Sequence, residues 1–278
     1  MKKTKEIFSK DATYQKFEVL KTNRNKRHRY QEFIIEGVRN INQATDHGWQ
    51  INSFIYERDH KLSGWARELL TITPTLINYS LSNSLMMELS GKADPSELLA
   101  IVSMQPPEAG KLSDVPVIAL FDRPSNKGNL GTLLRSCDAL GVEQLIITGH
   151  SIDIYDPEVI GASMGSFFKV PFLKLSDNRD IDEYINELRN RYPKLIVIGT
   201  AEDSGQAIYQ LDLISPLLIM IGNEKDGLNR HLQEACDVLA EIPMVKHRAA
   251  SSLNVSCAAT AVFYEIGRQR HIQNRTKD

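Results

Sequence analysis

Short, continuous apolar runs recur through the second half of the chain, and they constrain the fold more than any other feature of the sequence. The runs are rich in Val, Ile and Leu and lie at 117–121, 144–148, 195–199 and 217–221. Segments with helical apolar spacing separate or follow them, at 131–140, 181–191, 230–236 and 253–269. A strand that is apolar at every position is typical of a parallel sheet covered on both faces. The pattern therefore predicts an α/β domain built on a parallel sheet.

The first hundred residues show a weaker version of the same alternation. Strands are expected at 33–35, 51–56 and 98–102, and helices at 38–47, 65–70 and 81–89. The stretch MQPPEAGKLSDVP, at 104–116, interrupts the alternation and is typical of an interdomain linker. A chain of 278 residues is long enough for two domains. We expect an amino-terminal α/β domain at 1–105, a linker at 106–114 and a second domain at 115–278.

The formal net charge of −2 conceals an uneven distribution of charge. Residues 1–30 contain ten Lys and Arg but three Asp and Glu, which gives +7 and leaves −9 for the remainder. Taken as an average, the net charge argues against a nucleic-acid partner, because phosphate binding needs clustered positive charge. The basic segment 1–30 has two interpretations, a solvated tail or a surface that contacts a polyanion.

Several function classes are disfavoured by what the sequence lacks. Three widely spaced cysteines, with no Cys or His pair at metal-ligand spacing, indicate neither a disulfide framework nor a metal site. A cytoplasmic, reducing location is expected, and no apolar run reaches the length of a membrane span. The glycine-rich dinucleotide and phosphate loops, the nucleophile elbow and the zinc-protease motif are also missing.

A polar loop follows the predicted strand at 117–121, in the position where open parallel sheets bind ligands. The loop leads into a helix, with Asn129 placed as its cap and Arg135 six residues later. A helix amino terminus beside an arginine can bind an anion. An ordinary capped helix with a surface arginine is the alternative interpretation.

A second turn follows the predicted strand at 217–221, and a third follows a short apolar strand expected at 242–244. GNEKDGL at 222–228 is a glycine turn that lets the backbone approach a ligand closely. IPM at 242–244 leads to SSLN at 251–254, at the start of the last helix. Each is also compatible with a simple turn or a routine helix cap.

Taken together and in this order, the three turns resemble the motifs of the SpoU (TrmH-type) family of RNA ribose 2′-O-methyltransferases, in the SPOUT superfamily. The family carries N-x-G-x-x-x-R in a helix, G-x-E-x-x-G-L in a turn, and I-P-M before S-L-N at a terminal helix. The chain has NLGTLLR at 129–135, GNEKDGL at 222–228, IPM at 242–244 and SLN at 252–254. Each motif is weak alone, but the ordered set is highly specific and spans residues 115 to about 267.

The resemblance implies a carboxy-terminal domain whose last segment threads a loop as a deep trefoil knot. It also implies S-adenosylmethionine as the cofactor, no metal, and an obligate homodimer through this domain. The positions that match the family's catalytic residues are Asn129, Arg135, Glu224, Ser252 and Asn254. The positions that match or adjoin its cofactor contacts are Thr200, Ala201, Gly222, Asn223, Gly227, Leu228, Ile242, Met244 and Leu253.

A weaker likeness connects FIIEGVRNINQA, at 33–44, with the ribosomal-protein-like RNA-binding domain that often precedes this catalytic domain. It implies an RNA partner, and the separate domain favours ribosomal RNA over transfer RNA. The candidates for RNA contact are Lys21, Arg24, Lys26, Arg27, Arg29, Arg39 and Lys127. A transfer-RNA methyltransferase and a catalytically silent RNA-binding member of the fold are the alternatives. A small-molecule methyltransferase would need neither the first domain nor the basic segment.

The arginine of the first motif has often been assigned the removal of the ribose proton in this family. A guanidinium has a pKa above about 12 and does not deprotonate in proteins. We therefore expect Arg135 to bind a neighbouring phosphate and to stabilise the developing alkoxide, with the proton passing to water or a nearby acceptor.

Overall fold

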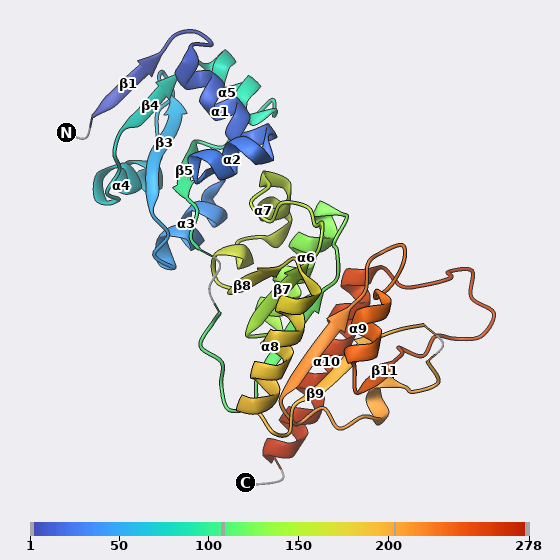
Figure 1. Cartoon of the computed structure of the whole chain (residues 1–278). Helices are drawn as coiled ribbons and strands as arrows, with labels where there is room; N and C mark the ends of the chain where they lie inside the picture. Colours follow the sequence, from blue (N-terminus) through green and yellow to red (C-terminus); the bar gives the residue numbers. More distant parts are fainter. Residues whose placement is uncertain (1–2, 107–108, 203, 276–278) are drawn as a thin grey trace. The chain divides into compact units, whose positions relative to one another are not determined.

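The computed structural model describes residues 3–106, 109–202 and 204–275, and these divide into two compact units (Figure 1). The amino-terminal unit comprises the chain up to Pro106 together with Asp153–Lys169. The carboxy-terminal unit comprises the remainder. None of the described helices is long and apolar enough to cross a membrane.

In the described part of the amino-terminal unit, five strands form a mixed sheet in the order β1-β4-β3-β5-β2. The strands are β1 (Thr4–Ile7), β2 (Glu32–Glu36), β3 (Ile51–Glu57), β4 (Asn78–Leu81) and β5 (Leu98–Ser103). β5 is antiparallel to both of its neighbours, whereas the β1–β4 and β3–β4 pairs are parallel. The accompanying helices are α1 (Ala12–Thr22), α2 (Arg24–Tyr30), α3 (Val38–Asp46), α4 (Gly64–Ile72) and α5 (Asn83–Ser90).

The basic segment 1–30 is folded, because its described residues form β1, α1 and α2. Asp11 caps α1 by accepting from the backbone N–H of Tyr14 at 2.9 Å. Tyr14 and Phe17 of α1 are fully buried and belong to a core cluster that includes Ile34 of the sheet. Burial of two aromatic side chains fixes this helix to the domain, so the interpretation of the segment as a solvated tail is wrong.

The residues at 153–169 pack with the amino-terminal unit, although the predicted boundary assigned them to the second domain. They form α7 (Pro157–Ser163) and the 3-10 turn η1 (Ser166–Phe168). Trp49 donates its indole N–H to the carbonyl of Phe168 at 3.0 Å, and its ring packs against Phe167. Phe33 of β2 contacts both Trp49 and Phe167, edge to face. An apolar cluster of this kind needs both chain segments to be complete.

Arg27 of α2 also holds the segment 153–169, through ion pairs with two aspartates. Its side chain is 1% exposed, and it donates to Asp153 at 2.8 Å and to Asp156 at 3.3 Å. The guanidinium also donates to the backbone carbonyls of Leu20 and Lys21. All three nitrogens of this buried cation are therefore paired, which offsets much of its desolvation cost.

Replacing Arg27 by methionine should destabilise the amino-terminal unit, because Asp153 and Asp156 would lose the cation that neutralises them. The expected loss is about 3–5 kcal/mol in the free energy of unfolding, measured by urea denaturation. Arg29→Met, an exposed change on the same helix, is the matched control and should leave stability nearly unchanged. Equal stability of the two variants would contradict a stabilising role for the buried ion pairs of Arg27.

Within the described residues of the carboxy-terminal unit, six strands form a wholly parallel sheet in the order β11-β9-β10-β6-β7-β8. The strands are β6 (Val117–Phe121), β7 (Gln144–Thr148), β8 (Phe172–Leu175), β9 (Ile196–Thr200), β10 (Leu217–Ile221) and β11 (Val238–Ala240). The helices are α6 (Lys127–Ala139), α8 (Asn178–Arg191), α9 (Arg230–Ala235) and α10 (Val255–Arg275), with a 3-10 turn η2 (Ile208–Gln210). The expected parallel α/β sheet is confirmed.

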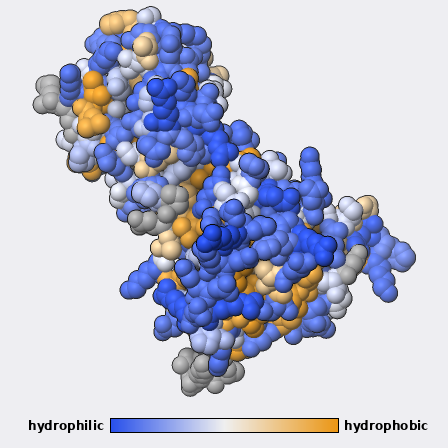
Figure 2. Space-filling view, in the orientation of Figure 1, coloured by the Kyte–Doolittle hydropathy of each residue, from blue (hydrophilic) through white to orange (hydrophobic). Residues whose placement is uncertain are grey.

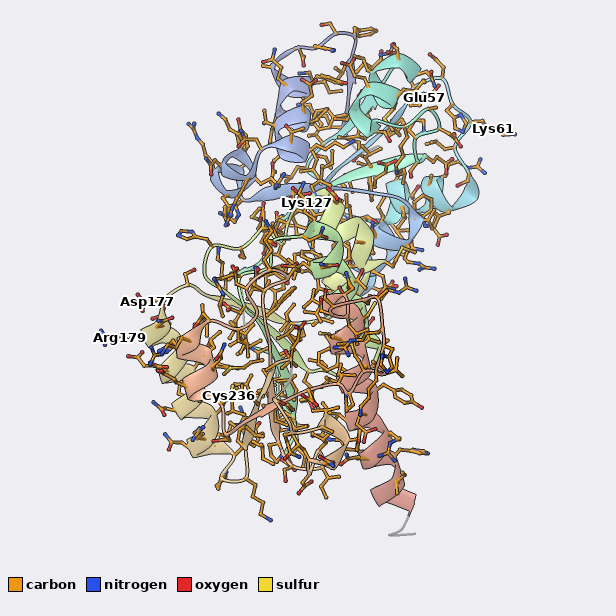
Figure 3. All side chains as sticks on the ribbon, turned by 90° about the vertical axis from the view of Figure 1, so that its right-hand side faces the viewer. Glu57, Lys61, Lys127, Asp177, Arg179 and Cys236 are labelled. Carbon is orange, nitrogen blue, oxygen red and sulfur yellow. The ribbon has the colours of Figure 1, made fainter. Side chains whose placement is uncertain are left out.

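Helices cover both faces of this sheet, as its continuous apolar strands require. On one face α8 and α9 place Ile185 and Leu232 in a core cluster with Ile118 and Leu218 of the central strands. Figure 3 shows α10 on the opposite side of the sheet from α8. There α10 packs against α6, and the hydroxyls of Ser136 and Thr260 lie 2.7 Å apart. The outer surface is mainly hydrophilic on the face shown in Figure 2.

Candidate active site

The loops that carry the sequence motifs meet at one edge of the parallel sheet. Strands β11, β9, β10 and β6 are consecutive neighbours and run in the same direction. Their carboxyl ends therefore lie side by side, and the chain that carries the motifs leaves the sheet at the ends of β6, β10 and β11. This is the edge at which open α/β sheets bind their ligands.

Asn126, not Asn129, caps α6. The side chain of Asn126 accepts from the backbone N–H of Asn129 at 2.9 Å, and the helix begins at Lys127. The expectation that Asn129 is the cap is therefore wrong. Its position in the first turn leaves the Asn129 amide available for contacts with other loops.

The carboxylate of Glu224, in the turn after β10, collects hydrogen-bond donors from the start of α6. It accepts from the backbone N–H groups of Ser125 and Asn126 at 3.2 Å and from the Ser125 hydroxyl at 2.8 Å. It also accepts from the side-chain amide of Asn129 at 3.2 Å. An acidic side chain is favourable at a helix amino terminus, where unpaired N–H groups concentrate positive charge.

These hydrogen bonds keep Glu224 ionised. Partial burial raises the pKa of the carboxyl, but the donors from its own backbone, Ser125 and Asn129 outweigh burial, and the net pKa lies below its ordinary value. Glu224 is therefore an acceptor at neutral pH.

Asn129 connects the first motif to the third. Its side-chain oxygen accepts from the amide of Asn254 at 3.0 Å, while its own amide donates to Glu224. Asn254 in turn caps α10, because its oxygen accepts from the backbone N–H of Ser256 at 3.0 Å. Glu224, Asn129 and Asn254 thus form one continuous chain of hydrogen bonds across three loops.

Ser256 belongs to the same network and was not predicted. Its side chain is buried, and its hydroxyl lies 3.2 Å from the carbonyl of Asn129 and 3.3 Å from the side-chain oxygen of that residue. Serine in the first turn of a helix carries no distinctive signal, because this residue is common there for local reasons.

Gly222 and Gly227 close the turn after β10. Asn223 and Gly227 exchange two backbone hydrogen bonds of 3.0 and 3.1 Å. A Cβ at Gly222 would lie 2.5 Å from the carbonyl carbon of Gly227 and from the backbone nitrogen of Leu228. Gly227 has φ +67°, in the left-handed region. Glycine at 222 therefore lets the turn close on itself, whereas Gly227 leaves open space beside the backbone.

The comparisons with known proteins agree with this arrangement. The model of the SpoU rRNA methylase family matches residues 116–264, and that of the SpoU L30e-like domain matches residues 11–100. The chain belongs to the SpoU rRNA methylase family. A 23S rRNA (uridine(2479)-2′-O)-methyltransferase of Streptomyces viridochromogenes is 39% identical, over 97% of this chain and 94% of the relative. A 23S rRNA (guanosine(2553)-2′-O)-methyltransferase of Bacillus subtilis is 27% identical, over 77% and 88%.

A solved SpoU structure has the same fold along nearly the whole chain. The SpoU methyltransferase AviRb from Streptomyces viridochromogenes, in complex with the cofactor AdoMet, matches with a TM-score of 0.88 and 37% identity. The match covers 94% of this chain and 98% of AviRb.

The other two positions predicted to be catalytic lie in α6 and just before α10. Arg135 lies in α6 and is exposed, and Ser252 is exposed just before α10. Among the described residues, no group of three His, Cys, Asp or Glu side chains could hold a metal ion.

The predicted cofactor positions lie at the end of β9 and in the segments that follow β9, β10 and β11. The Thr200 hydroxyl donates to the carbonyl of Met220 at 3.1 Å, and the Ala201 N–H donates to Ala240 at 3.0 Å, so these two groups already have partners. Ile242 and Met244 follow β11 and are half-buried, whereas Leu253 is 43% exposed. Leu228 is buried in the core below the turn.

One of the predicted RNA contacts is wrong, and the ammonium group of a second already has two partners. Arg27 is buried and paired with Asp153. Lys21 donates to the carbonyls of Leu89, at 2.7 Å, and Ser90, so it caps the carboxyl end of α5. Burial lowers the pKa of its ammonium group. Arg27 is therefore not available to a phosphate.

The remaining predicted contacts lie at the surface. Arg24, Arg29 and Arg39 are exposed, and Lys26 and Lys127 are partly exposed. Figure 3 shows Lys127 at the start of α6, within the carboxy-terminal unit. Arg39 also lines a shallow hollow along α3 with Asn42 and Gln43.

Glu224→Gln should destabilise the carboxy-terminal unit at neutral pH, because an amide cannot accept from all of these donors. The folded-state pKa of Glu224 is lowered from 4.5, so the stabilisation is present above that value. It is lost as the pH falls through the lowered pKa. The difference in unfolding free energy between wild type and variant should therefore shrink below about pH 4.5, in urea denaturation at several pH values.

Glu183→Gln, on the exposed side of α8, is the matched control and should leave stability at neutral pH nearly unchanged. A constant difference between wild type and Glu224→Gln from neutral pH to pH 3 would contradict the role of the ionised carboxylate.

Proposed function

We propose that the protein transfers the methyl group of S-adenosylmethionine to the 2′-hydroxyl of a ribose in 23S-type ribosomal RNA. The observation that carries the proposal is the hydrogen-bonded chain from Glu224 through Asn129 to Asn254, which joins the three SpoU motifs at one sheet edge. The relatives described above, named as 23S rRNA 2′-O-methyltransferases, support ribosomal RNA as the substrate class.

The turn at 222–228 fits the cofactor. A side chain at Gly222 would collide with the backbone of Gly227 and Leu228, so glycine is needed for the turn to close. At Gly227 no atom of the other described residues lies within 4 Å of the Cβ position, so the backbone there is open to a ligand. The loops that hold Thr200, Ala201, Ile242, Met244 and Leu253 complete the proposed cofactor site. When bound, S-adenosylmethionine supplies an activated methyl group.

Methyl transfer is an in-line displacement, so the protein acts mainly by aligning the ribose oxygen. Alignment of two reacting groups can supply several kcal/mol of the barrier. The network around Asn129 fixes the relative positions of the loops that would hold the two reactants. Arg135 binds a phosphate beside the reacting ribose and stabilises the developing alkoxide, and the proton leaves to water or a nearby acceptor.

A homodimer and a trefoil knot are also part of the proposal. The family resemblance supports both, and exposed apolar side chains in the carboxy-terminal unit support the homodimer. Val245 is 78% exposed and Tyr264, on α10, is 63% exposed. Apolar side chains at the surface of a monomer are candidates for a partner interface. A cytoplasmic location also stays a prediction.

The amino-terminal unit is proposed to bind the RNA substrate. Its match to the SpoU L30e-like domain and the exposed Arg24, Arg29 and Arg39 support this role. RNA is commonly recognised through shape and unpaired loops, with backbone phosphates contacted by basic side chains.

The methylation test uses purified protein, tritiated S-adenosylmethionine, and either 23S rRNA or transfer RNA transcribed in vitro. The expected result is label in a 2′-O-methylated nucleotide of 23S rRNA. Asn254→Ala should lower the rate about a hundredfold, because Asn129 would lose its partner. Asn178→Ala, an exposed change at the start of α8, should leave the rate unchanged.

Label in transfer RNA alone would overturn the substrate class. RNA binding without transfer to either RNA would favour the silent RNA-binding alternative.

Replacing Arg24 and Arg29 together by alanine should weaken RNA binding and reduce its dependence on salt. Each lost phosphate contact lowers the slope of log affinity against log salt by about 1. Filter binding at several salt concentrations measures this slope. Arg179→Ala, on the exposed side of α8 (Figure 3), is the control for loss of positive charge alone. An identical slope for the wild type and the double variant would contradict a role for Arg24 and Arg29.

A further inference from the structure

A fully buried carboxylate, Asp122, lies directly below the proposed active site. It is the first residue after β6 and is 0% exposed. It accepts from the Thr148 hydroxyl at the end of β7 at 2.8 Å. It also accepts from the backbone N–H of Asn229 at 2.9 Å and from the side-chain amide of that residue. A buried charge is tolerated when donors surround it in this way.

Asn229 makes the connection between Asp122 and the helix after the cofactor turn. The Asn229 oxygen caps α9 by accepting from the backbone N–H of Leu232 at 3.0 Å, while its amide points to Asp122. Asn229 is two residues after Gly227, so the contact with Asp122 fixes the position of the carboxyl-terminal end of the turn at 222–228.

Arg123 contacts the turn at 222–228 near both of its ends. Its guanidinium donates to Asp122 through two nitrogens at 3.1 and 3.0 Å, and one of them also donates to the carbonyl of Gly227 at 3.4 Å. Its backbone carbonyl accepts from the side-chain amide of Asn223 at 2.6 Å. Arg123 has φ +46°, unusual for a residue with a side chain, so this conformation is held by its surroundings.

We propose that Asp122 is a positioning residue for methyl transfer. Through Asn229 and Arg123 it holds the turn at 222–228 at a fixed distance from the loop that carries Asn129. This inference rests on the proposed function, because it assigns the cofactor to that turn and the ribose to the neighbouring loop. Asp122 touches neither reactant and acts through the two residues that it holds. An error of about 1 Å in such a spacing can lower a rate about a hundredfold.

Asp122→Asn tests the inference, because the amide keeps the shape of the side chain but loses the charge that pairs with Arg123 and turns one acceptor oxygen, which Asn229 and Arg123 use, into a donor. The measured quantities are the kcat and the KM for 23S rRNA with tritiated S-adenosylmethionine. We expect the kcat to fall about tenfold to a hundredfold while the KM for RNA stays at the wild-type value. Asn229→Ala should have a similar effect, and the double variant should be no slower than Asp122→Asn alone, because both act on one contact.

Asp237→Asn is the matched control. Asp237 also accepts from a backbone N–H, that of Val197 at 2.8 Å, and pairs with Arg189, but it lies at the amino-terminal end of the strands. This variant should lower the melting temperature without lowering the kcat.

A wild-type kcat in folded Asp122→Asn would overturn the inference, as would an equal loss of kcat in Asp237→Asn. If Asp122→Asn does not fold, Asn229→Ala is judged by the same two criteria. Absence of methyl transfer by the wild-type protein would instead overturn the proposed function, so the two failures are distinguishable.

Discussion

The parallel direction of the strands in the carboxy-terminal sheet is the constraint from which the site follows. Parallel pairing places the carboxyl ends of β9, β10 and β6 next to one another, although the chain reaches them in a different order. Residues separated by about a hundred positions, such as Ser125 and Glu224, therefore come within hydrogen-bond distance. The central strands, covered on both faces, supply a rigid base for loops that would otherwise have no fixed geometry.

The choice of side chains at this edge follows from their hydrogen-bonding capacities. An asparagine both donates and accepts, so Asn129 can connect an obligate acceptor, the Glu224 carboxylate, with a donor, the amide of Asn254. Aspartate at the same position could not donate to Glu224, and the two like charges would repel. Donation therefore runs in one direction, from Asn254 to Asn129 and from Asn129 to Glu224, and this fixes the orientation of both asparagine amides.

The parts of the structure that depend on local pattern could be predicted from the sequence, and those that depend on distant partners could not. The predicted strands at 117–121, 144–148 and 217–221 match β6, β7 and β10, because burial on both faces leaves an unmistakable apolar run. β8 and β11 were not predicted because they are short and partly exposed edge strands. The strand expected at 242–244 is wrong, because the edge strand ends at Ala240, before these residues.

The choice of cap at α6 shows the same limit at the level of single residues. Asn126 and Asn129 are both good caps by local rules. Their roles differ because of Glu224, whose carboxylate accepts from the backbone N–H of Asn126 and from the side-chain amide of Asn129. Likewise, the sequence around Arg27 does not indicate that this side chain is buried and paired with Asp153.

The path of the chain between the two units has an evolutionary consequence. The polypeptide passes from one unit to the other near residues 106, 152 and 169. Phe33 and Trp49 pack against Phe167, which is encoded more than a hundred codons later. A single recombination event could therefore not exchange the amino-terminal unit as a whole. A substitution on one side of this cluster therefore selects for compensation on the other, although the two segments of the unit are encoded far apart in the gene.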